Sequence, residues 1–408
     1  MGVLAKEETL REVLTQVKIL NKQSFDPKSW RGISEIVRSG MARDYLSVGD
    51  QIETTVEGET YLLDVVHHFD GSDDAHPLVK LADGSLVPGM CLQWHNALDF
   101  TTAFDSKEAF YAATDGLAAG KYSFSIEVAS KWGSGAFAAA GTKTYSFELT
   151  DAVPAGGQLV FGGDPYASQL TAVGVQVYKS FADTTPAQTC QVSEGAGGTD
   201  LGTMKTSVNG NFNQYPRATY GSNHWATSGL REWANSSAPA GGWDKKSTPW
   251  DRPHPLAATK GGLLSLLPAD MVAVLGAVSV KTQSHPGDSD GGTTVETFDK
   301  VFIPSARQHY FANYLVATSD GYEAEGVPWD YWSGLAKASG RTAAWAGWNT
   351  YPELITYSRS GNARFVFERS ANRGGLYGHG VGCVGASGGV DNSNASNGLY
   401  VAPACVLI

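Results

Sequence analysis

The sequence predicts a multidomain α+β protein that begins with short helices and continues mainly as short strands. Three observations lead to this fold class. The chain of 408 residues is too long for one small hydrophobic core. Its 48 glycines and 11% aromatic residues favour turns and strands over long helices. Its apolar residues change from helical spacing to alternation near Gly49.

Residues 1–104 predict an N-terminal attachment region of helices and β-hairpins. Helical spacing of apolar residues extends over about 7–46, and Asp26 followed by Pro27 is typical of a helix N-cap. The apolar face expected for the second helix consists of Trp30, Ile33, Ile36 and Val37. Turn sequences then predict two hairpins, around Glu57-Gly58 and Asp83-Gly84.

Residues 105–205 predict a small β-sandwich, because strands such as GKYSFSIEV, KTYSFELT and GGQLVFGG are separated by glycine turns. Residues 206–408 predict a third domain, with helices, strands and long ordered loops. One helix is expected at SGLREWANSS, with Leu230, Trp233 and Ala234 facing inward. A second is expected over 261–280, interrupted at Pro268, and strands are expected at DKVFIPS and ARFVFERS.

Composition and charge exclude several functional classes. A net charge of −11 without any basic run argues against a nucleic-acid partner. No run approaches 18 apolar residues, so no membrane insertion is expected. No secretory signal is visible, and four scattered cysteines favour assembly in a cytosol over a disulfide framework or zinc site. A Cys383–Cys405 bridge is the alternative that this spacing leaves open.

A search for catalytic and metal-binding patterns predicts no enzyme and no cofactor. No nucleophile elbow, Walker A or dinucleotide fingerprint occurs. His67 and His68 precede an acidic segment with Asp70, Asp73, Asp74 and His76. Adjacent histidines on a strand point to opposite faces, so a solvated turn is favoured there and no metal is expected. The loop SHPGDSDGG lacks the spacing of a calcium loop and is interpreted as a surface turn.

Two weaker patterns have a functional and a structural interpretation. Glu323, Glu325 and Asp330 are the candidate carboxylates if the chain acts on polysaccharide. Four tryptophans could stack on sugars, but we favour a role in bracing long loops for Trp243, Trp250, Trp329 and Trp332.

Several motifs occur together in one order: YGSNHWATSGLREWANSS, WDRPHP, the Gly-Leu-rich segment 261–280, DKVFIPS, FERSANRG and APACVLI. In this order they resemble virion proteins of phages that infect gut bacteria and end in a C-type-lectin-like domain. LSVGDQI, LADGSLVPGM and the central AAGKYSF…KTYSFELTDAVPAGGQLVF block also look like those proteins, so the resemblance covers the whole chain. The same family includes variable proteins diversified by retroelements and is related to the formylglycine-generating fold, whose cysteine chemistry these scattered cysteines do not support.

The resemblance implies that 206–408 is a C-type-lectin-like domain whose final strand, about 401–407, returns into the core beside ARFVFERS. It places a variable binding region at 374–400. Relatives that bind sugar through Ca²⁺ use Glu-Pro-Asn or Gln-Pro-Asp followed by Trp-Asn-Asp, and these triplets are absent here. The missing triplets argue against Ca²⁺-dependent sugar binding by this chain.

The composition of 374–400 fits such diversification. One third of the segment is glycine, and Lys, Glu, Gln, Met and Trp are absent. In these retroelements the adenines of Asn codons (AAY) are copied unfaithfully, and changes at the first two bases cannot give those five residues. A glycine-rich loop that merely lacks long side chains is the alternative. The predicted exposed contact or variable positions are Leu376, Tyr377, His379, Asn392, Asn394, Asn397, Leu399 and Tyr400.

The sequence thus predicts a phage virion protein on the tail or capsid surface, made in the host cytoplasm. Its partners would be a host-surface protein or glycan and, through the N-terminal region, other virion proteins. The alternatives are a structural capsid, head-decoration or head-fibre protein and, second, a polysaccharide-acting enzyme. A homotrimer is plausible by analogy with tail fibres, although no heptad run supports one.

Overall fold

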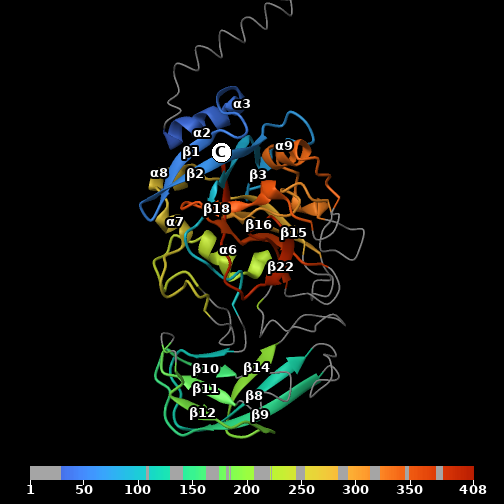
Figure 1. Cartoon of the computed structure of the whole chain (residues 1–408). Coiled ribbons are helices and arrows are strands. Elements are labelled where there is room, and N and C mark those ends of the chain that lie inside the picture. Colours follow the sequence, from blue (N-terminus) through green and yellow to red (C-terminus); the bar gives the residue numbers. More distant parts are fainter. Residues whose placement is uncertain are drawn as a thin grey trace, which may run out of the picture.

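The largest sheet joins strands from the two ends of the chain. Its strands lie in the order β1–β2–β5–β23–β17, and every neighbouring pair is antiparallel. They are β1 (Gln51–Val56), β2 (Glu59–Phe69), β5 (Gly89–Trp94), β23 (Ala404–Leu407) and β17 (Val301–Phe302). The last strand of the chain is therefore an interior strand of this sheet (Figure 1).

The computed structural model describes residues 29–106, 110–128, 141–161, 174–180, 183, 185–205, 221, 223–244, 253–283, 293–312, 322–344, 349–373 and 380–408. Within these ranges the chain is mixed α+β, mostly strand with few helices, and forms several sheets, which confirms the predicted class. We call the described residues of 29–106 and 221–408 the main body. Its buried side chains form two hydrophobic clusters that draw on both segments.

The N-terminal strands belong to the main body, which changes the expected domain layout. A division after residue 104 would cut the five-stranded sheet between β5 and β23. It would also split a hydrophobic cluster that contains Leu63, Leu92 and Val406. The part of 1–104 that the structure describes is therefore packed with the C-terminal segment and shares its core.

The first described helix, α2 (Trp30–Arg38), begins later than predicted. Asp26 lies outside the described residues, and the N-cap is Ser29, whose Oγ accepts a hydrogen bond of 3.1 Å from the Gly32 amide. The predicted apolar face is confirmed, because Trp30, Ile33, Ile36 and Val37 are buried. The Ser34 hydroxyl donates to the Ile408 carbonyl at 2.6 Å, which ties the helix to the C-terminus. A short helix, α3 (Ala42–Tyr45), follows.

Both predicted hairpins are present. Glu57 and Gly58, with φ of +53° and +81°, form the two-residue turn between β1 and β2. This left-handed geometry suits the right-handed twist of the strands that it joins. Gly84, with φ of +86°, turns the chain between β3 (Val79–Lys80) and β4 (Leu86–Val87).

The final strand is shorter and lies elsewhere than expected. β23 pairs with β5 and β17, and not with the strands of ARFVFERS. That segment instead contacts Tyr400, four residues before β23, because the Phe367 amide donates to the Tyr400 carbonyl at 3.1 Å. All four residues of β23 are buried, as an interior strand of a covered sheet requires.

The central segment forms two four-stranded sheets, ordered β12–β11–β10–β7 and β13–β9–β8–β14. One hydrophobic cluster includes side chains of both sheets, and the Phe124 and Phe161 rings meet at 4.5 Å between their centroids. The strands are β7 (Phe110–Ala113), β8 (Gly120–Val128), β9 (Gly141–Leu149), β10 (Gly157–Phe161), β11 (Val175–Tyr178), β12 (Gln188–Cys190), β13 (Ser193–Glu194) and β14 (Thr199–Lys205).

Short helices and small sheets complete the main body. The inward residues predicted at SGLREWANSS are buried in a helix, but 261–280 forms two short helices around Pro268 and becomes strand at Val278. The helices are α6 (Gly229–Ala234), α7 (Leu263–Leu266), α8 (Ala269–Val274) and α9 (Asp330–Ala338), with 3₁₀ turns η1 (Trp225–Thr227), η2 (Glu323–Glu325) and η3 (Pro352–Leu354). Among the described residues, no helix has the length and apolar character needed to cross a membrane.

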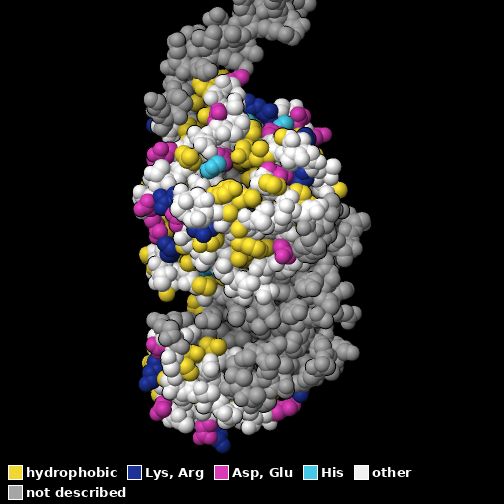
Figure 2. All heavy atoms as spheres, in the orientation of Figure 1, with side chains coloured by type: hydrophobic (Ala, Val, Ile, Leu, Met, Phe, Trp, Pro, Cys, Tyr) yellow, Lys and Arg dark blue, Asp and Glu magenta, His cyan; other side chains and the backbone are white. Residues whose placement is uncertain are grey.

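Three small sheets complete the main body. They are β15 (Val278–Gln283) with β16 (Thr294–Asp299), then β19 (Ala363–Arg364), β18 (Thr356–Ser358) and β6 (Asn96–Ala97), and finally β20 (Val366–Ala371), β21 (Gly380–Val384) and β22 (Val390–Asn394). Figure 2 shows hydrophobic side chains gathered on one face of the main body, and Tyr357 of β18 is 44% exposed.

Candidate functional site

The predicted variable region starts between two strand ends that lie side by side. β20 and β21 are antiparallel, with Ala371 opposite Val381, and the Asn372 amide donates to the Gly380 carbonyl at 2.8 Å. Along the chain, residues 374–379 connect these two points. Leu376, Tyr377 and His379 fall in that connection and lie outside the described residues. The base of the segment is thus set by strand pairing.

β22 places two of the predicted contact residues on one face, opposite glycines. Asn392 pairs with Gly382, and Asn394 pairs with Gly380. A Cβ atom at Gly380 would lie 2.6 Å from the Asn392 side-chain oxygen. Gly380 therefore makes room for the Asn392 side chain. This gives the glycine content of the region a local structural reason. Asn392 and Asn394 are half-buried, where the sequence predicted exposure.

The three remaining predicted residues differ in exposure. Asn397 is exposed, as predicted, and its side-chain amide donates to the Ser393 hydroxyl at 2.9 Å. Leu399 and Tyr400 are half-buried, which corrects the prediction. The Leu399 backbone exchanges two hydrogen bonds with Thr102, and the Arg364 guanidinium lies 4.6 Å from the centre of the Tyr400 ring. Both side chains also pack against hydrophobic clusters.

Arg369 lies in β20, directly before this region. We call the buried strands β20 and β23, with the residues that hydrogen-bond to them, the frame of the region. The Arg369 guanidinium donates to the carbonyls of Ile303 and Glu325, each at 2.9 Å, and to the Gln308 side chain at 2.6 Å. Burial lowers the pKa of Arg369 to about 10, although the charge of Glu325 opposes this shift. A buried guanidinium with these partners fixes the backbone of the loops that it contacts.

The carboxylates considered for an enzyme lie in different environments. Glu325 is buried, and its two oxygens accept from the Gln283 amide and the Ser370 hydroxyl. Burial raises the pKa of Glu325, while the charge of Arg369 acts in the opposite direction. Glu323 is exposed, and Asp330 belongs to the histidine cluster described next. Glu325 is therefore a frame residue.

His67, His76 and Asp330 form a cluster where the end of β2 and the loop after it meet the start of α9, and no local sequence pattern indicates that Asp330 belongs to it. Their ligand-type atoms lie within 4.8 Å of one another. His76 Nε2 is 3.0 Å and His67 Nδ1 is 3.5 Å from Asp330 Oδ2. Burial alone would raise the pKa of Asp330, but hydrogen bonds and charge from His67 and His76 lower it to about 2.

Two other residues of the acidic segment, Asp70 and Asp73, lie next to this cluster. His76 Nδ1 lies 2.7 Å from Asp73 Oδ1, and Arg43 pairs with Asp70 while its guanidinium lies 4.0 Å from Asp330. His68 is outside the cluster; burial, with the charge of Arg43, lowers its pKa to about 4. Of the adjacent histidines only His67 takes part, in accord with their opposite directions on β2.

The cysteines and tryptophans are structural. All four cysteines are buried and free, so the Cys383–Cys405 alternative is wrong. The indole of Trp243 donates to the Lys260 carbonyl and that of Trp332 to the Gln93 side chain, each at 2.8 Å. Trp329 is fully buried, and Trp250 lies outside the described residues. These contacts support the bracing role.

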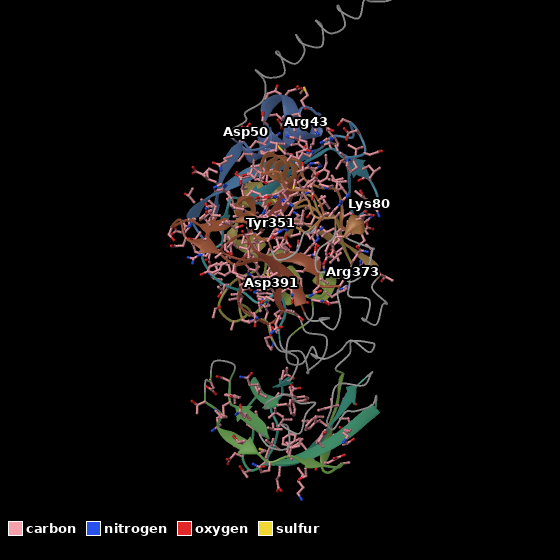
Figure 3. All side chains as sticks on the ribbon, turned by 45° about the vertical axis from the view of Figure 1, so that its right-hand side comes forward. Arg43, Asp50, Lys80, Tyr351, Arg373 and Asp391 are labelled. Atoms are coloured by element: carbon pink, nitrogen blue, oxygen red, sulfur yellow. The ribbon has the colours of Figure 1, made fainter. Side chains whose placement is uncertain are left out.

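Arg43 and Asp391 show that the two candidate regions are far apart. Figure 3 places Arg43, beside the histidine cluster, at one end of the main body and Asp391 of β22 at the other.

No protein-family model matches the sequence, and the comparisons with curated proteins and solved structures found no significant similarity.

Proposed function

We propose that this chain is a bacteriophage virion protein whose C-terminal, C-type-lectin-like domain binds a protein or glycan on the host surface. The proposal starts from the order of motifs that resemble such virion proteins over the whole chain. In this proposal the N-terminal part attaches the chain to other virion proteins. α2 lies at the end of the main body opposite β22, which is compatible with attachment at one end and recognition at the other (Figure 1).

The observation that carries the proposal is the contrast between β22, inside the region 374–400, and the strands around it. β20 and β23, before and after the region, and β21, within it, are buried at every position. β22 is half-buried or exposed from Asp391 to Asn394. The five residue types that altered Asn codons cannot encode are missing from the same region. A buried frame can keep its strand register while residues between its strands vary.

The side chains of the region suit recognition of a polar surface. Antibody binding loops combine Tyr with small polar residues, because Tyr supplies contact area at little entropic cost. The region 374–400 contains two Tyr, three Ser and three Asn, with one third glycine. The half-buried Asn392 and Asn394 and the exposed Asn397 present amide groups that can both donate and accept hydrogen bonds.

A binding experiment tests recognition directly. The full-length protein is measured against whole gut bacteria and a glycan array, alongside the double variant Asn392→Ala/Asn397→Ala. Loss of the two amides should weaken binding by about tenfold or more if they contact the ligand. Asn362→Ala removes an exposed amide from another turn and is the matched control. Equal binding by all three proteins would contradict the assignment of the region.

Diversification has its own test. A near-identical copy of the 3′ end of the gene beside a reverse transcriptase gene is expected, together with substitutions concentrated at the Asn-type codons of 374–400. Substitutions spread evenly over the last 200 codons in a phage population would contradict a diversified binding region.

A further inference from the structure

We propose that His67, His76 and Asp330 form a binding site for one divalent transition-metal ion, with Zn²⁺ as the ion that its donors fit best. This inference does not depend on the proposed receptor-binding function, because the cluster and β22 lie at opposite ends of the main body (Figure 3). Two imidazoles and one carboxylate are a donor set that zinc takes in sites with an open coordination position. A water molecule would complete the coordination.

The spacing of the donor atoms matches the edges of a coordination shell. With metal–ligand bonds of about 2.1 Å, two ligands of one ion lie about 3.0 Å apart at 90° and about 3.4 Å apart at the tetrahedral angle. His76 Nε2 and His67 Nδ1 lie 3.0 Å and 3.5 Å from Asp330 Oδ2. The whole set lies within 4.8 Å, so small side-chain movements bring all three donors onto one ion.

His76 is oriented as metal-binding histidines are. Its Nδ1 faces Asp73 Oδ1 at 2.7 Å, and its Nε2 faces the Asp330 carboxylate. A neutral ring with its proton on Nδ1 donates to Asp73 and directs the Nε2 lone pair at the cluster. Carboxylate–histidine–metal relays of this kind fix the tautomer and raise the basicity of the ligand.

The charges around the cluster also favour binding of a cation. Asp70 and Asp330 lie beside the Arg43 guanidinium, and a third carboxylate, that of Asp73, lies beside His76. A divalent ion would balance the two negative charges that Arg43 leaves. His67 is fully buried on β2 and keeps its ring stacked on that of His76, with 5.1 Å between the centroids. One donor of the site is therefore held rigidly by the sheet.

A metal here would connect parts of the chain that are distant in sequence. His67 lies at the end of β2, His76 in the loop that follows, and Asp330 at the first position of α9. The side chain of Asp330 is 33% exposed, so an ion has access from solvent. The metal would tie α9 to the N-terminal hairpin and stabilise the folded chain by mass action.

The test measures Zn²⁺ binding to the full-length, untagged protein after treatment with a chelator. Titration calorimetry should give one Zn²⁺ per chain, and Zn²⁺ should raise the melting temperature in a concentration-dependent way. Asp330→Asn and His76→Ala should each weaken Zn²⁺ affinity by more than the about 10–100-fold typical of losing an outer partner. Asp73→Asn, which removes only the orienting carboxylate, should fall within that range.

Two variants are matched controls. Asp74→Asn removes the same charge from the same exposed loop, and His95→Gln removes an imidazole outside the cluster. Both should bind Zn²⁺ as the wild type does. Asp330→Asn conserves the side-chain shape, and the circular dichroism of each variant in chelator reports its folding. The absence of saturable Zn²⁺ binding, or an equal loss in Asp74→Asn and Asp330→Asn, would overturn the site.

Discussion

The Tyr351 amide donates a hydrogen bond of 2.8 Å to the Gly388 carbonyl, which ties the segment between β21 and β22 to the turn η3. Gly388 has φ of +80°, and a Cβ atom there would overlap the carbonyl of Tyr351. Gly388→Ala is therefore expected to destabilise the protein by about 2 kcal/mol or more, from backbone strain and overlap together. Chemical denaturation measures this difference in unfolding free energy.

Gly389→Ala is the matched control for that substitution. Its nearest neighbour to a new Cβ is the Ser387 hydroxyl at 3.7 Å, so its cost should be within about 0.5 kcal/mol. If both substitutions lowered the unfolding free energy by a similar amount, the close approach of Tyr351 would not be the reason that position 388 requires glycine. The comparison also distinguishes a glycine that the local backbone geometry requires from one that another residue can replace.

Local sequence patterns predicted the local structure of this protein and little of its long-range assembly. The turn at Glu57-Gly58 and the buried face of α2 follow from patterns only a few residues long. The insertion of β23 between β5 and β17 depends on pairing across more than 300 residues, which no periodicity encodes. The same holds for the candidate metal site, because Asp330 is more than 250 residues from both His67 and His76.

Exposure also separated one correct contact-residue prediction from the others, because among the described contact residues only Asn397 is exposed. Arg369 is buried in β20 although that strand also contains Glu and Ser, so its burial does not follow from an apolar pattern. The half-buried state of Leu399 and Tyr400 comes from contacts with Thr102 and Arg364, which the sequence around them does not indicate. Exposure in a loop depends on which distant segment covers it.

Arg369→Lys is expected to destabilise the protein strongly although the charge is conserved. The guanidinium reaches Ile303, Gln308 and Glu325 from one buried position, and an ammonium group cannot reproduce this planar set of donors. Buried acceptors left without a donor cost about 1–3 kcal/mol each, so a loss of at least about 3 kcal/mol is expected from equilibrium denaturation.

Arg31→Lys provides the comparison for Arg369→Lys. Arg31 is 87% exposed and pairs with Glu35 one helical turn away, so its replacement should change stability by less than about 0.5 kcal/mol. If the two variants lost similar amounts of unfolding free energy, the buried hydrogen bonds of Arg369 would not explain its contribution to stability.

The contact between His95 and Asp64 should make stability depend on pH. His95 Nδ1 lies 2.8 Å from Asp64 Oδ2, and this hydrogen bond raises the pKa of His95 above its usual value of 6.5 although partial burial opposes the shift. Because the folded-state pKa is raised, the stabilisation is complete below about pH 6.5 and is lost as pH rises through the folded-state pKa. Unfolding measured from pH 5.5 to 8.5 should show this loss.

His95→Gln should remove that part of the pH dependence. The difference in stability between the wild type and the variant should be largest at low pH and shrink as pH rises. Because the His95 side chain is 43% exposed, added salt should reduce the difference at low pH. A difference that is constant over the whole pH range would exclude the charged contact as its origin.

The four thiols should be unreactive in the folded protein. Burial raises the pKa of Cys91, Cys190, Cys383 and Cys405, and the thiolate is the form that reacts with alkylating reagents. Iodoacetamide at pH 8 should therefore leave them unmodified until guanidinium unfolds the chain, after which mass spectrometry should find all four labelled without reductant.

Asn397→Cys, at the exposed position in the predicted binding region, should react quickly in the native state and serves as the positive control. Native labelling of Cys383 or Cys405 would contradict their burial, and fewer than four reactive thiols after unfolding would indicate a disulfide.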